Sequence, residues 1–281
     1  MKVKITSDST CDLSPELLAK YDIETVPLSV HCGDRMGRDG LEITPEDIYS
    51  YVDSSGQLPR TSAVNIFDYI RVFRRWREQG YEVVHICISS DFSCSYQNAC
   101  VAAADVGGVY VVDSRNLSTG QGLLVLRAAE LAALGCDGAD IRRQCAELSE
   151  RVEASFVIDR LDYLYKGGRC SALSAFGGNL LRLKPCIEVR GGRMVPGKKY
   201  RGSIEKVMLQ YVQERLRGRE DIDQHRIFLT YTRCDPAAVE AVRQAIRELQ
   251  PQVEEILETT AGSTITCHCG PNTLGVLFIR R

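Results

Sequence analysis

The chain has 281 residues, a formal net charge of -2 at pH 7 and a sequence pI of about 6.1. Its lysines and arginines are scattered rather than gathered into a stripe, so nucleic acid is not expected as a partner. No apolar run approaches the ~20 residues that a membrane-spanning helix needs, and the N-terminal residues predict a strand and a turn rather than a secretory leader, so we expect a cytoplasmic protein.

Short apolar runs alternate with helical patterns in the first half of the chain. Strands are predicted at residues 3–7, 24–30, 83–89 and 109–113, and helices at residues 15–21, 45–52, 66–79, 95–104 and 120–134. Ser14 and Thr44 each provide a hydroxyl cap before a proline at the first helical position. Alternation of this kind predicts a mainly parallel sheet flanked by helices.

The pattern changes after residue 151. A strand is followed by a short helix that ends at Gly167-Gly168, a helix that starts near Ser171 and a hairpin that turns at Gly191-Gly192. Further helices are predicted at residues 204–216 and 237–249, and strands at residues 226–231, 255–259 and 274–279. The sequence therefore predicts two α/β domains, residues 1–152 and 153–281, of which the second contains a mixed sheet.

The chain contains 12 cysteines. Four of them lie at apolar positions of predicted elements, where a free thiol behaves as a small hydrophobic group: Cys87, Cys100, Cys145 and Cys186. We therefore expect reduced thiols that fill the core rather than a framework of disulfides.

The best metal candidate is the segment CHC at Cys267, His268 and Cys269, with Cys234 as a further thiol. Paired ligands of a structural zinc site are normally spaced roughly two to four residues apart. Adjacent residues of an extended segment also point to opposite sides. The spacing argues against a metal, and no cofactor is expected.

Hydroxyl-rich turns follow the predicted strands. Functional residues of a parallel sheet gather at the carboxyl ends of its strands. This rule selects four turns, which are SDST (7–10), PRTSA (59–63), SSDFSCSY (89–96) and VDSRNLSTGQG (112–122). None of the four contains a histidine.

Ser93 precedes the helix predicted from Ser95, where free backbone N–H groups and the positive end of the helix dipole favour an anion. Either serine could instead only cap that helix, and Thr61 with Ser62 could only start another. One hydroxyl is enough to cap a helix, whereas these turns contain two to four. The excess favours an anion site made of neutral donors.

Two histidines have simple interpretations. His268 lies in a segment punctuated by glycine and proline, which is typical of a solvated loop residue. His85 lies within an apolar strand, where we expect a hydrogen-bonded core residue.

Two other classes of function are weaker alternatives. A serine hydrolase needs a nucleophile elbow G-x-S-x-G and a histidine base. The elbow is absent, so an esterase or acyl transferase would have to pair Ser93 with His268. Nucleotide binding needs a glycine-rich phosphate loop after the first strand, and none is present. We therefore expect a non-enzymatic protein with no catalytic residue.

An ordered set of motifs resembles the DegV family of bacterial fatty-acid-binding proteins over essentially the whole chain. The motifs are SDSTCDLS (7–14), PRTSA (59–63), ISSDFSCSYQNA (88–99), VDSRNLSTGQG (112–122), LDYLYKGGRCS (161–171), LLRLKPCIEVRGGRM (180–194), KKYRG (198–202) and HCGPNTLGVLF (268–278). Each motif alone is weak, but their order makes the set specific. The resemblance implies two α/β domains and an apolar tunnel near the domain junction that binds a long-chain fatty acid.

The resemblance also implies roles for individual residues. Thr61 and Ser93 would hydrogen-bond the carboxylate of the fatty acid, helped by the backbone N–H of Cys94. His268 and Arg169 fall on a histidine and an arginine of the family's motifs and would be nearby polar groups. Neutral donors suit this ligand, because a carboxylate in an apolar tunnel must keep hydrogen bonds or lose its charge.

The resemblance further implies a protein partner. In family members that serve the bacterial fatty acid kinase, the acyl group is presented to a separate ATP-binding kinase subunit, which phosphorylates the carboxylate. The basic segment that contains Arg201 would face that subunit.

Three positions depart from the family's pattern. Cys94 replaces a glycine beside the carboxylate, where it would shift the backbone or crowd the head group. Asn272 replaces a glycine in a change expected to be mild, because asparagine tolerates left-handed geometry. The segment TSAVN (61–65) differs from the family's TSQPS just before a helix.

Overall fold

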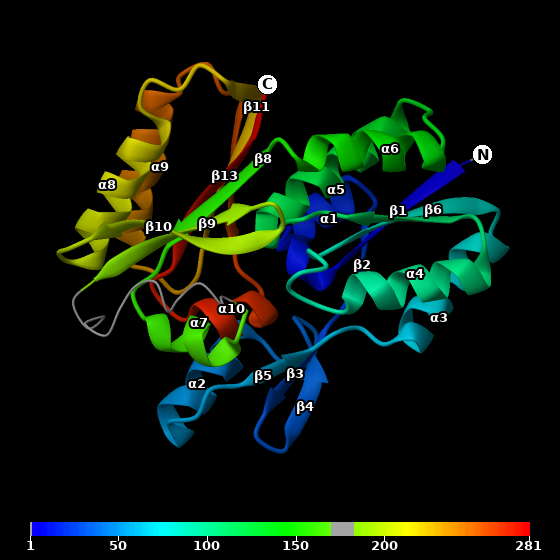
Figure 1. Cartoon of the computed structure of the whole chain (residues 1–281), viewed down its shortest axis with the longest axis horizontal. Coiled ribbons are helices and arrows are strands. Elements are labelled where there is room, and N and C mark those ends of the chain that lie inside the picture. The colour runs from blue at the N-terminus through cyan, green and yellow to red at the C-terminus, as the bar shows by residue number, and fades with distance from the viewer. Residues whose placement is uncertain (1, 170–182) are drawn as a thin grey trace. The chain divides into compact units, whose positions relative to one another are not determined.

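The computed structural model describes residues 2–169 and 183–281. The helix predicted from near Ser171 lies outside these residues. The chain divides into two compact units, whose helices and strands are labelled in Figure 1. Unit 1 consists of Met1–Arg151, Gly191–Arg193 and Gly262–Thr264, and unit 2 consists of Val152–Arg190, Met194–Ala261 and Ile265–Arg281.

A four-stranded parallel sheet lies at the centre of unit 1. Its strands have the order β2 (Glu24–Val26), β1 (Lys2–Asp8), β6 (Tyr81–Cys87) and β7 (Val109–Asp113). One face is covered by α3 (Ile66–Glu78) and α4 (Ser95–Val106), and the other by α5 (Ser118–Ala133) and α6 (Gly138–Ser149) (Figure 1). The predicted parallel sheet flanked by helices is confirmed.

Apolar side chains fill the space between this sheet and the pair α3 and α4. Val83 and Cys87 of β6 pack with Tyr69 and Phe73 of α3 and with Ala99 of α4, and all five are fully buried. Burial of apolar surface contributes ~25 cal/mol per Å². The turn between β6 and α4 therefore joins two elements that are fixed by the core.

Two predicted helix caps are confirmed. Ser14 Oγ accepts a hydrogen bond from the N–H of Leu17 at the start of α1 (Pro15–Lys20). At the start of α2 (Pro45–Ser55), Thr44 Oγ1 accepts from the N–H of Asp47, whose carboxylate accepts from the N–H of Thr44 at 2.8 Å. These bonds satisfy N–H groups that have no acceptor within the helix.

Unit 1 also contains a small antiparallel sheet that was not predicted. Its strands have the order β4 (Arg35–Arg38), β3 (Ser29–Cys32) and β5 (Arg60–Ser62). The single strand predicted at residues 24–30 is wrong, because β2 and β3 are separated at Pro27 and Leu28. Proline cannot donate a ladder hydrogen bond, so the chain can leave one sheet here and join another. The helix α6 and the 3-10 turn η1 (Ser9–Cys11) were also not predicted.

Unit 2 is built on a six-stranded mixed sheet, as the sequence predicted. Its strands have the order β10 (Arg193–Tyr200), β9 (Lys184–Arg190), β8 (Val152–Val157), β13 (Leu274–Arg280), β11 (Ile222–Tyr231) and β12 (Glu255–Thr260). β11 and β12 are parallel, whereas β8 is antiparallel to both β9 and β13. The helices α8 (Ile204–Leu216) and α9 (Pro236–Leu249) lie side by side and bury their apolar residues against the sheet (Figure 1).

Two short helices precede strands of unit 2. α7 (Leu161–Gly167) ends at Gly168, which has a φ of 70° and so provides the left-handed cap that glycine favours. α10 (Ser263–Cys269) was not predicted, because its sequence STITCHC is rich in residues with low helix propensity. Ile265, Thr266 and Cys267 are all buried, so packing rather than propensity stabilises this helix.

The four cysteines that the sequence places at apolar positions are buried or half-buried. Every cysteine that the structure describes is a free thiol. Cys87, Cys145 and Cys186 are buried and Cys100 is half-buried. Within residues 2–169 and 183–281, no helix is long and apolar enough to cross a bilayer.

Candidate functional site

Most hydroxyl groups in the selected turns of unit 1 have internal partners. Their hydrogen bonds run from Ser7 to the carbonyl of Ile86, from Ser9 to Asp39, from Thr10 to Gln121, from Ser89 to the carbonyl of Gly192, from Ser90 to Asp113 and from Ser118 to Asp12. These bonds explain most of the excess of hydroxyls over helix caps.

Ser93 is half-buried in the turn between β6 and α4. Its Oγ accepts a hydrogen bond from the backbone N–H of Ser95 at 3.2 Å and lies 2.9 Å from the Oγ of Ser95. The N-cap of α4 is Cys94, which makes no capping bond through its side chain. The bond from the Ser95 N–H uses one lone pair of the Ser93 hydroxyl, and the contact with the Ser95 hydroxyl uses its hydrogen or its second lone pair, so one position remains for another partner.

Cys94 is exposed and has ordinary backbone geometry, with a φ of -72° and a ψ of 2°. Any L-residue adopts these angles, so the cysteine does not strain the turn in place of the family's glycine. As the N-cap of α4, Cys94 lies where helical N–H groups have no acceptor within the helix. The backbone at this position remains suited to an oxygen ligand.

Thr61 lies in β5 opposite Val30 of β3, so it does not start a helix as one prediction allowed. The next helix, α3, is capped instead by Asn65, whose Oδ1 accepts from the N–H of Asp68 at 2.9 Å. The same bond explains how α3 begins after the segment TSAVN, which differs from the family's pattern, because asparagine is among the best N-cap residues. Thr61 is half-buried.

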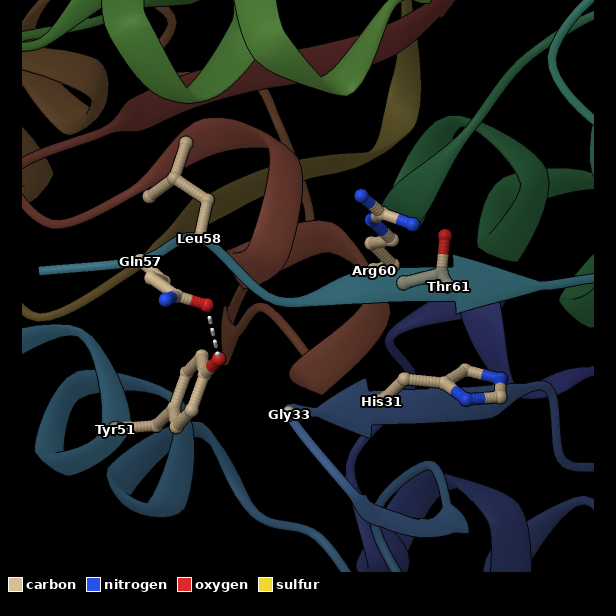
Figure 2. A pocket seen from close by; sticks show the side chains of 7 residues that line it. All are labelled: His31, Gly33, Tyr51, Gln57, Leu58, Arg60 and Thr61. Atoms are coloured by element: carbon tan, nitrogen blue, oxygen red, sulfur yellow. Dashed lines mark hydrogen bonds between the residues drawn. The ribbon is translucent and has the colours of Figure 1, made fainter. Parts of the chain in front are cut away.

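Thr61 lines a pocket of about 440 Å³ in unit 1 (Figure 2). The other lining residues are His31, Gly33, Tyr51, Gln57, Leu58 and Arg60. Figure 2 shows the Thr61 hydroxyl pointing away from the His31 ring. The Nε2 of His31 lies 3.0 Å from the Oγ of Ser62, the next residue of β5. Alternation along the strand thus directs the Thr61 and Ser62 hydroxyls to opposite sides.

One side-chain hydrogen bond connects the two turns that carry Thr61 and Ser93. The Nδ2 of Asn98, in the first turn of α4, donates to the carbonyl of Val64 at 2.8 Å. Val64 is buried and follows β5. The start of α4 and the chain that leaves Thr61 are therefore fixed to each other within unit 1.

A buried polar cluster that the sequence did not predict lies at the ends of β1 and β6. Asp8 Oδ1 accepts a hydrogen bond from the Tyr69 hydroxyl at 2.5 Å, and Asp8 Oδ2 accepts from the backbone N–H of Ile88 at 2.9 Å. His85 is fully buried, with Nε2 3.2 Å from Asp8 Oδ1 and Nδ1 2.8 Å from the hydroxyl of Thr6. The prediction of a hydrogen-bonded core histidine is confirmed.

Asp8, His85 and Cys87 place potential metal ligands within 4.8 Å of one another. The carboxylate and both ring nitrogens already have hydrogen-bonding partners. Burial, followed by the charge of Asp8, raises the pKa of the Cys87 thiol well above its usual range, which opposes the thiolate that a metal requires. Hydrogen bonding, not metal binding, accounts for the cluster.

His268 and Arg169 lie in unit 2 and interact electrostatically. His268 belongs to α10, so the prediction of a solvated loop residue is wrong. Burial, followed by the positive charge of Arg169, lowers the pKa of His268 to about 4. Arg169 is exposed just after α7, and its Nη1 donates to the carbonyl of Gly167 at 2.7 Å. His268 is therefore a neutral imidazole at neutral pH.

Arg201, Asn272 and the CHC segment are the other positions in unit 2 that the sequence analysis selected. Arg201 is exposed directly after β10. Asn272 has a φ of 57°, which confirms that it adopts the left-handed geometry expected where the family has glycine. The CHC segment is helical rather than extended, and Cys267 and Cys269 are both buried free thiols.

Comparisons with known proteins agree over the length of the chain. The family model described as "Uncharacterised protein, DegV family" matches residues 2–281. A Thermotoga maritima protein named "Fatty acid-binding protein" is 33% identical over 288 residues, which cover 98% of this chain and 96% of the relative.

Solved structures of other proteins also match nearly the whole chain. A structure described as fatty acid binding of a DegV family protein from Thermus thermophilus is 32% identical, with a TM-score of 0.90 over 100% of both chains. A stearic-acid-binding protein from Eubacterium ventriosum is 28% identical, with a TM-score of 0.82 over 99% of this chain and 98% of the other.

Proposed function

Because the chain belongs to the DegV family, we propose that it binds a long-chain fatty acid and holds the carboxyl group with Thr61 and Ser93. The observation that carries this proposal is the position of Ser93, which is half-buried just before α4 and keeps one hydrogen-bonding position of its hydroxyl beyond its two contacts with Ser95. Two relatives of similar length are described as fatty-acid-binding proteins, which supports the same ligand class.

The chemistry of such a ligand fits these residues. Each methylene group that leaves water contributes ~0.8 kcal/mol, so the acyl chain supplies most of the affinity. The carboxyl group needs hydrogen bonds to replace those lost with water. Thr61, Ser93 and the backbone N–H of Cys94 are polar groups that supply such bonds without a buried counter-ion.

We propose further that the protein is a carrier rather than an enzyme. Ser93 has no activating base among its hydrogen-bonding partners, which are the backbone and hydroxyl of Ser95. His268, the base of the alternative esterase, is a poor proton acceptor at neutral pH because its pKa is lowered to about 4. A fluorophosphonate probe should therefore leave Ser93 unlabelled, and stoichiometric labelling there would favour the esterase.

We infer that a separate ATP-binding kinase subunit phosphorylates the bound carboxyl group and docks at the exposed segment containing Arg201. Arg201→Glu should abolish acyl phosphate formation in a reconstituted mixture while leaving fatty acid binding unchanged. The matched control is Arg217→Glu, since Arg217 is an exposed arginine at the end of α8 in the same unit. Loss of activity in both variants would contradict a specific role for Arg201.

The direct test of fatty acid binding is mass spectrometry of an organic extract of the purified protein, followed by calorimetric titration of delipidated protein with hexadecanoate. We expect a co-purified acyl species and saturable binding that is at least tenfold weaker in Ser93→Ala and in Thr61→Val. Absence of both an acyl species and a binding isotherm would overturn the proposal.

A further inference from the structure

We propose that Gly192 and Arg193 hold the Ser93 turn, residues 88–94 between β6 and α4, in the geometry that binds the carboxyl group of a fatty acid. The two residues are then positioning residues, which act on the ligand through Ser93. This inference rests on the proposed function, since it concerns how the residue assigned to the head group is held. It gives Gly192 a role beyond the hairpin turn that the sequence predicted.

Gly191, Gly192 and Arg193 belong to unit 1, as does the Ser93 turn. They lie where β9 passes into β10. Gly191 and Gly192 have φ angles of 56° and 83°. The favoured two-residue hairpin turn requires a positive φ at both central residues, so turn geometry accounts for the presence of both glycines. Turn geometry does not account for what Gly192 and Arg193 contact.

Gly192 lies directly against the Ser93 turn. Its carbonyl accepts a hydrogen bond from Ser89 Oγ at 2.8 Å, and Ser89 is fully buried. A Cβ at position 192 would come within 2.9 Å of Ser89 Oγ and 3.2 Å of Asp91 Oδ2. Any other residue would therefore displace the Ser89 hydroxyl and break its bond to the carbonyl of residue 192. Glycine is required here for close approach as well as for its φ.

Ser89 connects Gly192 to Ser93. The carbonyl of Ser89 accepts from the N–H of Phe92 at 2.9 Å and from the N–H of Ser93 at 3.3 Å. The hydroxyl of Ser89, which donates to Gly192, also accepts from the N–H of Asp91 at 3.3 Å. A displacement of Ser89 is therefore transmitted to the backbone of Ser93 through a hydrogen bond.

Arg193 makes a second attachment to the same turn. Its Nε donates to Asp91 Oδ1 at 2.8 Å, and the Arg193 side chain is 75% exposed. Exposed ion pairs are individually weak, so this pair supports the hydrogen bond of Gly192 rather than replacing it. Elsewhere in the turn, Ser90 Oγ donates to Oδ2 of Asp113, the last residue of β7, at 2.6 Å. The turn is thus attached both to β7 and to Gly192 and Arg193.

A fixed turn matters because the head group makes few bonds. Loops are more mobile than the elements that they connect, and a binding group must be held within about 0.5 Å of its productive position. Ser93 keeps one hydrogen-bonding position beyond its contacts with Ser95. Loosening the turn should therefore weaken binding of the head group by misplacing that one position.

Gly192→Ala tests the close approach. Calorimetric titration of the delipidated variant with hexadecanoate should show binding at least fivefold weaker than in the unchanged protein. The matched control is Gly191→Ala, which strains the same hairpin turn. A Cβ at position 191 has only Arg115 Nη2 near it, at 3.7 Å, and so meets no atom of the Ser93 turn. Binding in the control should stay within twofold of the unchanged protein.

The Ser93→Ala background separates a positioning role from a general loss of structure. Two changes that act through one residue are not additive, whereas independent changes are. In this background Gly192→Ala should alter hexadecanoate binding by less than twofold. Hydrogen exchange of the Ser93 amide, measured without ligand, should be at least threefold faster in Gly192→Ala than in Gly191→Ala.

Arg193→Gln provides a variant on the surface, which keeps the inference testable if Gly192→Ala does not fold. It should weaken hexadecanoate binding about twofold or more and speed exchange of the Ser93 amide. The matched control is Arg190→Gln, because Arg190 is an exposed arginine of the same hairpin whose carboxylate partner, Glu188, lies in its own strand. This control should leave both measurements unchanged.

The possible failures are distinguishable. Equal binding in Gly192→Ala and Gly191→Ala, or an undiminished effect of Gly192→Ala in the Ser93→Ala background, would overturn the inference while leaving fatty acid binding intact. Equal exchange of the Ser93 amide in the two glycine variants would also overturn it. Absence of any binding isotherm in the unchanged protein would instead overturn the proposed function, and with it the role inferred for Gly192.

Discussion

Gly167 lies against the imidazole ring of His268, so closely that a Cβ at position 167 would come within 2.4 Å of Nδ1. Both residues belong to unit 2. Gly167→Ala should therefore displace the His268 ring and raise its pKa from about 4 toward the usual value of 6.5, because the displaced ring regains water. The measurement is an NMR titration of the His268 ring proton.

Gly168→Ala is the matched control for that change. No atom lies within 4 Å of a Cβ built at Gly168, but its φ of 70° strains any other residue. The control should cost ~1 kcal/mol of unfolding free energy while leaving the His268 titration unaltered. A shift of equal size in both variants would show that loss of stability alone moves His268.

His268 should make stability depend on pH in a defined window. Its pKa is about 4 in the folded protein and near 6.5 when unfolded, so the unfolded chain binds the extra proton between these values. Stability is then complete above pH 6.5 and falls as pH drops toward 4, by up to ~3 kcal/mol. His268→Gln should flatten this part of the profile measured by urea unfolding; an unchanged slope would contradict the assignment.

Asp12 should act in the opposite direction. Burial, reinforced by the charge of Asp39, raises the pKa of Asp12 from 3.8 to about 8, against the opposing effect of hydrogen bonds from Ser118 and Gly262. Here the folded protein holds the extra proton, so this group loses its stabilising contribution as pH rises from 3.8 to 8.

Asp12→Asn should remove that loss, because the neutral amide still accepts from the N–H of Gly262. Its stability relative to the unchanged protein should rise with pH across this window, by at most ~1.4 kcal/mol per pH unit. Denaturant unfolding at several pH values measures the difference. A constant difference would show that the Asp12 pKa is not raised.

Cys94 provides a chemical probe of the ligand site. It is the exposed free cysteine among those that the structure describes, and it follows Ser93 directly. Hexadecanoate should slow the reaction of Cys94 with a maleimide at least tenfold, because the bound head group and acyl chain cover it. Cys94→Ser identifies the protected thiol by mass spectrometry. An unaltered rate at saturating ligand would place the head group elsewhere.

The sequence predicted the elements whose patterns are long and regular. The limits of β7 and α8 agree with those predicted, because each forms an unbroken apolar or amphipathic run. β4 and β5 have only four and three residues, which is too short for a periodic signal. α10 was missed because β-branched residues and cysteines disfavour a helix that burial nevertheless stabilises.

The candidate site was predictable only in part. Ser93 could be selected because it lies in the turn between a predicted strand and a predicted helix, a position that the local sequence pattern indicates. The hydrogen bond between Tyr69 and Asp8 could not be predicted, since it depends on how α3 packs at the end of β1.

Unit 1 is assembled from three separate stretches of the chain, and this has a consequence for dissecting the protein. The N–H groups of Gly262 and Ser263 donate to Asp12 and Asp39, each at 2.9 Å. A chain truncated after Arg151 would leave both buried carboxyl groups without these donors. The N-terminal half is therefore not an independent module, and fragments expressed alone should aggregate or unfold even though they encode the whole parallel sheet.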